Sequence, residues 1–163
     1  MIVILMGVSG SGKTTIGTLL AERLHLIFAD ADDYHSAANK AKMAAGHPLD
    51  DQDREPWLET LNKLLLAWFE AGKGGVLACS ALKDAYRKTL ARGLPINAIA
   101  FVLLDGSKEM IAARLAHRKD HYMNPALLDS QFATLELPAN ALRIVNDRAP
   151  NAVVDEIVQH LTD

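Results

Sequence analysis

The sequence predicts an α/β fold, in which a parallel five-stranded sheet is covered by helices on both faces. Three observations predict it. Short apolar runs of strand length alternate with longer segments of helical character. The chain contains no repeat or low-complexity tract, and a glycine-rich stretch joins its first apolar run to its first helical segment. Strands that alternate with helices form parallel sheets, whose binding sites lie at the carboxyl ends of the strands.

The first half of the chain supplies three strands and two helices. Strands are expected at the apolar runs Ile2 to Met6, Leu26 to Ala29 and Gly75 to Cys79. The first helix follows the glycine-rich stretch, with apolar residues at helical spacing at Ile16, Leu19, Leu20 and Leu24. The second covers Trp57 to Ala71, because Pro56 in the first turn and Gly72 at the end are typical of helix boundaries.

The second half completes the alternation. Two more strands are expected at Ala98 to Leu104 and at Arg143 to Asn146. Helices are expected over Ala81 to Arg92, Ser107 to Arg118, Pro125 to Leu135 and Ala152 to Leu161. The residues that directly follow each strand are therefore the ones to search for function.

Whole-chain properties predict one domain over residues 1–163. The chain is half hydrophobic with a formal net charge of -3, which suits a full core and argues against a dedicated nucleic-acid binder. Its one cysteine, Cys79, allows no disulfide framework and is expected to be a small packed residue; Trp57, Trp68 and Phe69 also fit core packing. No apolar segment approaches membrane-spanning length, so we expect a cytoplasmic protein without a membrane partner.

The stretch GVSGSGKTT, from Gly7 to Thr15, fits the pattern GxxxxGK[ST]. Such a loop brings backbone N–H groups to a helix N-terminus, where they and the helix dipole bind an anion. We expect the loop to hold the phosphates of a nucleoside triphosphate, through Gly7, Ser9, Gly10, Ser11, Gly12, Lys13, Thr14 and Thr15. Lys13 would reach the β- and γ-phosphates and the Thr14 hydroxyl would hold Mg²⁺. The alternative is a glycine-rich turn that binds nothing.

An acidic run follows the second strand. Asp30, Asp32 and Asp33 crowd one loop, and their mutual repulsion favours a bound cation or a role in accepting a proton. The alternative is a solvated turn of helix-capping aspartates. The phosphate loop one helix earlier favours the functional interpretation, because a metal site and a base are what phosphoryl transfer still requires.

Several basic residues stand near the predicted strand ends. Arg54 lies in the acidic segment DDQDREPW, where the alternative is a surface ion pair. Lys83 and Arg87 are four residues apart, as are Arg114 and Arg118, and like charges at this spacing are unfavourable without an anion. Solvated helix faces are the alternative for both pairs. His117 and His121 have metal-ligand spacing but no evident third ligand, so zinc is not expected.

Four blocks of the chain resemble the gluconate kinases (gluconokinases). They are GVSGSGKTT, DADDYHSAANKAKMAAGHPLDDQDREPWL, CSALKDAYRKTL and RKDHYMNPALLDSQFATLELP, and they span Gly7 to about Pro138. The resemblance implies a P-loop fold similar to nucleoside monophosphate and shikimate kinases, and ATP-dependent phosphorylation of D-gluconate at its primary hydroxyl to 6-phospho-D-gluconate. It also implies a homodimer.

The resemblance assigns roles by position. Lys13 and Thr14 match the phosphate and Mg²⁺ residues, Asp30 an aspartate near the metal, and Asp32 the aspartate at the acceptor hydroxyl. The positions around the sugar acid are His35, Arg54, Lys83, Tyr86 and Arg87. Those of a mobile lid, around residues 116–125, include Arg114, Arg118 and His121. Lys13, Asp32 and Arg118 are thus the expected catalytic residues, with Arg114 and Arg118 meeting the triphosphate.

Two other classes of protein were compared with this one. A regulatory GTPase would need the motifs DxxG and NKxD, and neither occurs. A nucleotide kinase on the same fold would be expected to stack aromatic residues on its acceptor base, but only 6% of residues are aromatic. A shikimate-type kinase stays as the alternative, disfavoured only by the four blocks. The segment NDRAPNA either lies against adenine or forms a plain turn.

Overall fold

The computed structural model describes residues 1–117 and 125–163. Its centre is a five-stranded sheet in the order β2-β3-β1-β4-β5, and every pair of neighbouring strands is parallel. The strands are β1 (Ile2–Met6), β2 (Ile27–Asp30), β3 (Gly75–Ala78), β4 (Ile99–Asp105) and β5 (Leu142–Val145). This confirms the predicted fold class, and each strand lies within one residue of its predicted position at either end.

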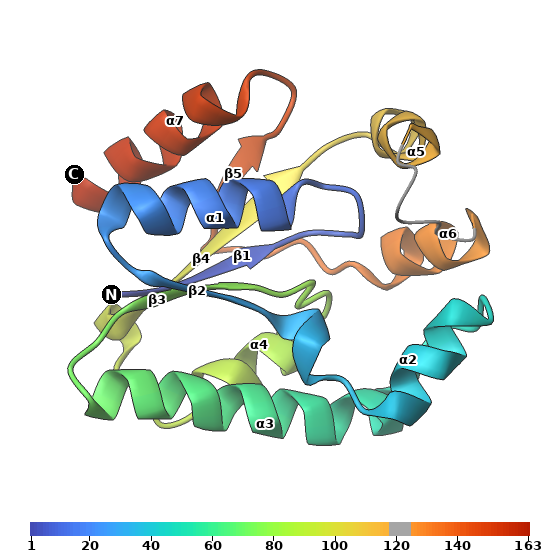
Figure 1. Cartoon of the computed structure of the whole chain (residues 1–163), viewed down its shortest axis with the longest axis horizontal. Helices are drawn as coiled ribbons and strands as arrows, with labels where there is room; N and C mark the ends of the chain where they lie inside the picture. The colour runs from blue at the N-terminus through green and yellow to red at the C-terminus, as the bar shows by residue number, and fades with distance from the viewer. Residues whose placement is uncertain (118–124) are drawn as a thin grey trace.

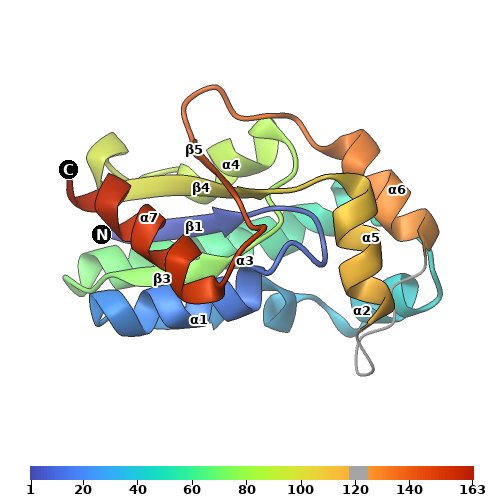
Figure 2. The same cartoon turned by 90° about the horizontal axis from the view of Figure 1, so that it is seen from above.

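Helices cover both faces of this sheet. They are α1 (Lys13–Leu24), α2 (Ala37–Ala44), α3 (Asp51–Glu70), α4 (Asp84–Ala91), α5 (Lys108–Ala116), α6 (Pro125–Thr134) and α7 (Pro150–Thr162). Figure 1 shows α1 and α7 on one face and α3 and α4 on the other. Helices α2, α5 and α6 lie together at the end of the molecule to which the strands point (Figure 2).

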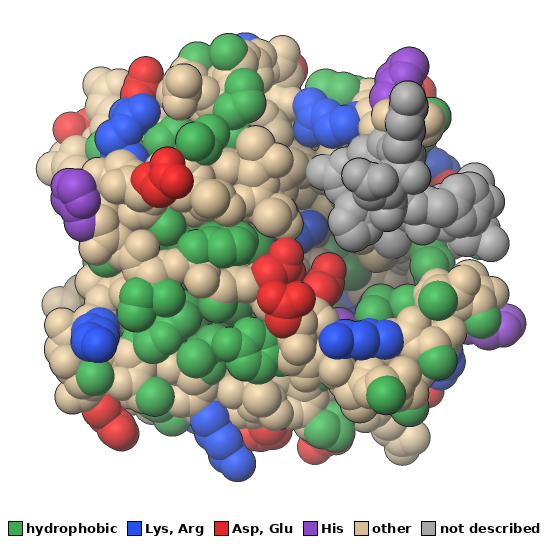
Figure 3. Space-filling view, viewed as in Figure 1, with side chains coloured by type: hydrophobic (Ala, Val, Ile, Leu, Met, Phe, Trp, Pro, Cys, Tyr) green, Lys and Arg blue, Asp and Glu red, His purple; other side chains and the backbone are tan. Residues whose placement is uncertain are grey.

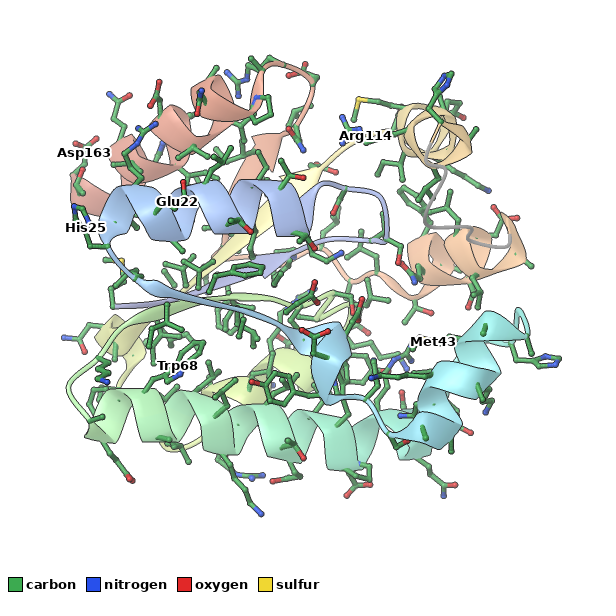
Figure 4. All side chains as sticks on the ribbon, viewed as in Figure 1. Glu22, His25, Met43, Trp68, Arg114 and Asp163 are labelled. Atoms are coloured by element: carbon green, nitrogen blue, oxygen red, sulfur yellow. The ribbon has the colours of Figure 1, made fainter. Side chains whose placement is uncertain are left out.

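Strand β1 separates two hydrophobic cores. Ile2, Ile4 and Met6 point into the core against α3 and α4, which also holds Trp68 (Figure 4). Val3 and Leu5 point the other way, into the core against α1 and α7. Because β1 is buried on both faces, its sequence is continuously apolar and not alternating, which is why the run was readable as a central strand.

Helix α3 begins six residues earlier than predicted. The Asp50 carboxylate accepts from the Asp53 N–H at 2.7 Å, and the Asp53 carboxylate accepts from the Asp50 N–H at 3.0 Å. This reciprocal capping box satisfies two backbone donors and starts the helix at Asp51, so Pro56 lies inside the helix and not in its first turn.

Three other expectations need correction. Helix α2 was not predicted, although Ser36 caps it by accepting from the Asn39 N–H at 3.1 Å. Helix α4 starts at Asp84 because Ala81 has a left-handed φ of 44° and Lys83 is extended with a ψ of 149°, and a helix can include neither conformation. Phe69 is 42% exposed on α3 and does not pack in the core as expected, whereas Trp57 and Trp68 do.

In the part of the chain that the structure describes, no helix is both long enough and apolar enough to span a membrane.

Candidate active site

The loop between β1 and α1 has the backbone of a phosphate-binding nest. Gly12, at the N-terminus of α1, has a left-handed φ of 97°, and an added Cβ would lie 2.3 Å from the Asn146 amide nitrogen. A Cβ on Gly7 would lie 2.5 Å from the Ser11 hydroxyl, which is buried with no hydrogen-bond partner among the described residues. Only glycine fits these two positions, and the resulting cradle of N–H groups at a helix N-terminus suits a phosphate group.

Lys13 and Thr14 lie where the loop motif predicts them. The Lys13 ammonium donates to the carbonyls of Gly7 and Val8, both at 2.9 Å, and so lies across its own loop. The Thr14 hydroxyl donates to one oxygen of the Asp30 carboxylate at 3.0 Å, and the Asp32 N–H donates to the other at 3.0 Å. A hydroxyl and a carboxylate oxygen beside a phosphate cradle are ligands that Mg²⁺ takes.

A pocket opens beside this loop, between the turn after β2, helices α2 and α3, and helix α6. Of the predicted site residues, it brings together Ser9, Lys13, Asp30, Asp32, His35 and Arg54. The residues that the sequence did not single out as site residues are Met43, Pro48, Leu49, Trp57, Ala78, Ser80, Leu82, Leu127, Ser130 and Gln131. Figure 4 shows Met43 on α2 beside this space, and Figure 3 shows acidic side chains gathered next to the hollow.

Asp32 and His35 meet at the wall of this pocket. The Asp32 carboxylate is 81% exposed, and its Oδ1 lies 3.9 Å from Nε2 of the buried His35 ring. Burial, helped by the positive charges of Arg54 and Lys40, lowers the pKa of His35 to about 4, so its ring is neutral at pH 7. Asp33 is exposed and does not line the pocket, which favours Asp32 over its neighbour as the acidic group of this site.

Arg54 enters a network at the outer edge of the pocket. Its guanidinium donates to the Tyr86 hydroxyl at 3.0 Å, and that hydroxyl donates to the Asp51 carboxylate. Lys83 also contacts Asp51, at 3.1 Å, and the hydrogen bonds from Tyr86 and Lys83 lower the pKa of Asp51. Lys83 thus has a carboxylate partner and lies in a groove next to the pocket, whereas Arg54 lines both.

Arg87 is placed differently from the expectation for a residue around the sugar acid. Its buried guanidinium donates to the backbone carbonyls of Ala81, Leu82 and Glu136, and it does not line the pocket. The buried carbonyls of the turn after β3, where Ala81 has a left-handed φ, need donors. Arg87 therefore holds the turn after β3, and it does not share a helix face with Lys83, which caps α4.

Arg114 joins helix α5 to the phosphate loop. Its guanidinium donates to the Asn146 carbonyl at 2.7 Å and to the Ser11 carbonyl at 3.3 Å, and Figure 4 shows it on the side of α5 that faces the loop. The Asn146 amide donates to the same Ser11 carbonyl at 2.8 Å. Arg118, His121 and most of the predicted lid, residues 116–125, lie outside the described residues.

Two side chains that support the loop were missed in the sequence. Asn146 falls in the segment considered for adenine, but its amide supports the loop backbone. Gln131 on α6 accepts from the Ser9 N–H at 2.7 Å and donates to the Ser9 hydroxyl at 3.1 Å. Only the resemblance of its block could have indicated Gln131, because a glutamine on a helix carries no signal of its own.

Across residues 1–117 and 125–163, no group of three or more His, Cys, Asp or Glu side chains could hold a metal ion. Cys79 is buried as expected, and burial raises the pKa of its thiol to about 12, so it is unreactive at neutral pH.

A phosphate-binding loop that shares one pocket with an acidic group and an arginine defines a P-loop kinase of small molecules. The comparisons with known proteins agree. The shikimate kinase family model matches residues 9–162. The thermosensitive gluconokinase of Escherichia coli is 49% identical over 83% of this chain and 71% of its own, and the gluconokinase of Gluconobacter oxydans is 45% identical over 96% and 89%.

Solved structures point the same way. A gluconokinase from Sinorhizobium meliloti superposes with a TM-score of 0.89 at 36% identity, covering 99% of this chain and 91% of that one. Shikimate kinase from Aquifex aeolicus has a TM-score of 0.58 at 20% identity, over 99% and 96% of the two chains, and so shares the fold alone. The chain belongs to the gluconokinase family of P-loop kinases.

His35 gives a prediction about stability. Its pKa is 6.5 when unfolded and about 4 when folded, so between these values the unfolded chain binds more protons. The contribution of His35 is fully present above pH 6.5 and is lost as the pH falls toward 4. We expect the free energy of unfolding, measured by urea titration at several pH values, to fall less steeply over this range in His35→Gln than in the wild type. The exposed His47→Gln should keep the wild-type slope, and equal slopes in all three proteins would contradict the assignment.

Proposed function

We propose that this protein transfers the γ-phosphoryl group of ATP to the primary hydroxyl of D-gluconate, giving 6-phospho-D-gluconate and ADP. The observation that carries this proposal is the single pocket in which Lys13 of the phosphate loop, the Asp32 carboxylate and the Arg54 guanidinium all lie. The reaction requires a phosphate site, a group beside the attacking hydroxyl, and a cation for the acceptor's carboxylate. The names of the relatives, which are gluconokinases, support this choice of acceptor.

At the phosphate end of the pocket, the chain would bind and orient the triphosphate of ATP. The loop from Gly7 to Thr15 would hold the phosphate oxygens through its N–H groups, and Lys13 would turn from the loop carbonyls to the transferred group. Thr14 and Asp30 would hold Mg²⁺, which when bound neutralises the phosphate charge. Arg114 would support the loop through the Ser11 and Asn146 carbonyls, and its expected contact with the triphosphate stays a prediction.

At the acceptor end, Asp32 faces the attacking hydroxyl. The hydroxyl oxygen forms a bond to the γ-phosphorus as the bond from that phosphorus to the ADP oxygen breaks, and the hydroxyl proton passes to Asp32. His35 would donate to the acceptor, and Arg54 would hold the carboxylate at the other end of the sugar acid. Lys83 would assist from the neighbouring groove, whereas Arg87 would act only by holding the turn after β3.

A shikimate-type acceptor would also need an arginine for its carboxylate, so Arg54 alone does not distinguish a gluconate kinase from a shikimate kinase. Relatives named gluconokinase reach 45 to 49% identity, against 20% for the shikimate kinase structure, and this favours gluconate. The proposal includes a cytoplasmic homodimer that binds neither nucleic acid nor membrane. The roles expected of Arg118 and His121 stay predictions.

The proposed reaction can be tested directly. With ATP and Mg²⁺, a coupled assay of ADP release should show turnover with gluconate and little with shikimate. Lys13→Ala should lower kcat by about 10²-fold or more, because it removes a positive charge from the transferred phosphate, while its circular dichroism stays unchanged. Turnover with shikimate and none with gluconate would refute the choice of acceptor.

The acidic pair gives a second prediction. Asp32→Asn should lower kcat by about 10² to 10⁴ with little change in the KM for ATP, because the amide cannot accept the hydroxyl proton. Asp33→Asn is the matched control, since Asp33 is exposed, adjacent and outside the pocket. If Asp33→Asn loses more activity than Asp32→Asn, the base lies one residue further along.

Recognition of the carboxylate gives a third prediction. Losing a charge-assisted contact to a desolvated carboxylate costs about 1.5 to 3 kcal/mol, so Arg54→Ala should lower kcat/KM for gluconate by roughly 10- to 150-fold. A neutral polyol with the same hydroxyls makes no such contact, so Arg54→Ala should change its kcat/KM much less. The two acceptors and two proteins form a double cycle that isolates the contact. An equal loss for both acceptors would leave Lys83 as the better candidate.

A further inference from the structure

Asn39 is a buried polar residue to which the proposed reaction assigns no role. It lies on α2 and is 7% exposed. Its amide nitrogen lies 2.8 Å from the Asp53 backbone carbonyl on α3 and 3.4 Å from Nδ1 of His35. The side chain thus touches both the start of α3 and the ring beside Asp32.

These two contacts determine where the His35 proton is. A backbone carbonyl only accepts, so the group of Asn39 that faces Asp53 must be the amide NH₂. That nitrogen has no acceptor capacity, so its second N–H is directed at His35 and Nδ1 of the ring must be the unprotonated nitrogen. In a neutral imidazole the proton is then on Nε2.

The rest of the ring's surroundings fix its plane. His35 stacks on Trp57 with ring centroids 4.1 Å apart and an interplanar angle of 16°. Trp57 is itself held, because its indole N–H donates to the Ala31 carbonyl at 2.7 Å. Stacking is kept when the ring flips over about its Cβ–Cγ bond, which exchanges the positions of its nitrogens and carbons, so a contact at the ring edge is needed to direct the nitrogens. Asn39 supplies that contact.

We propose that Asn39 is a positioning residue that fixes His35 as the Nε2–H tautomer, so that His35 offers an N–H donor to the acceptor beside Asp32. The Nε2 atom is the one that lies 3.9 Å from the Asp32 carboxylate, and both side chains line the acceptor pocket. The tautomer follows from the resting structure alone. Only its consequence for catalysis rests on the proposed function.

The tautomer matters because Asp32 and the ring act on the same hydroxyl. An Nε2–H donates to the hydroxyl oxygen and leaves the hydroxyl proton directed at Asp32. With the proton on Nδ1, the bare Nε2 would accept that hydroxyl proton and compete with Asp32. A protonated ring would pair with the Asp32 carboxylate and weaken it as a base. The burial that keeps His35 uncharged acts together with Asn39.

The first test is spectroscopic and needs no substrate. Long-range ¹H–¹⁵N NMR of the ¹⁵N-labelled full chain distinguishes the two tautomers, and loss of one set of signals in His35→Gln assigns them. We expect Nε2–H in the wild type. Asn39→Asp should move the proton to Nδ1 or protonate the ring, because a carboxylate only accepts. A wild-type ring with its proton on Nδ1, or with both tautomers populated, would overturn the proposal.

Asn62→Asp is the matched control. Like Asn39, Asn62 is a buried amide. Its nitrogen donates to the backbone carbonyls of Leu90 and Arg92, both at 2.9 Å, and not to a histidine. This substitution should lower stability but leave the His35 signals unchanged. A His35 change as large as that in Asn39→Asp would reduce Asn39 to a general packing role and overturn the proposal.

Kinetics test the consequence. Asn39→Asp should lower kcat/KM for gluconate by about 5- to 30-fold with the KM for ATP unchanged, and Asn62→Asp should not. A switched tautomer with unchanged kinetics would overturn the catalytic part. If Asn39→Asp does not fold, Asn39→Ala replaces it, and the wild-type spectrum still decides the tautomer. A wild type that fails to phosphorylate gluconate refutes the proposed function and leaves the tautomer result intact.

Discussion

The position of β1 at the centre of the sheet is the constraint on which the site depends. Its five apolar residues are buried on both faces, so the strand cannot shift by one residue without exchanging its two cores. The parallel register aligns Leu5 of β1 with Ala78 of β3, and Ala78 with Asp30 of β2. The phosphate loop, the turn after β3 and the acidic turn therefore all start at one level, and the packing of the strands brings their polar groups to one edge of the sheet.

The central strands β1 and β3 could be predicted from sequence because parallel, doubly buried strands are continuous apolar runs. The starts of α3 and α4 could not, because side-chain capping and single backbone angles decide them. The reciprocal bonds of Asp50 and Asp53 start α3 before its apolar pattern is visible, and the left-handed Ala81 delays α4. Helix α2 is short, its exposed side is mostly alanine and its buried residue is the polar Asn39, so its sequence has no apolar stripe and only Ser36 signalled it.

The residues of the site also divide into those that the sequence could predict and those that it could not. Lys13 and Thr14 were predictable because they belong to a contiguous motif whose spacing determines their positions, and Asp32 because it follows a strand end. Arg87, Asn146 and Gln131 act on backbone groups, and for Asn146 and Gln131 these groups are more than a hundred residues away in the chain. Composition and spacing cannot distinguish an arginine that binds an anion from one that satisfies a strained turn. Only the fold shows which carbonyls need a donor.

The charges in the pocket would also orient the proposed acceptor. Among the described residues that line the pocket, Lys13 and Arg54 are the cations, and Asp30 and Asp32 supply carboxylates. A sugar acid has one negative end, which Asp30 and Asp32 repel and Arg54 attracts. Lys83 competes weakly for that end, since Asp51 already neutralises it. The neutral primary hydroxyl is then the end left to face Asp32 and the phosphate loop. The choice of the primary hydroxyl would thus follow from the positions of Asp30 and Asp32 relative to Arg54. It would not require a separate contact for each hydroxyl.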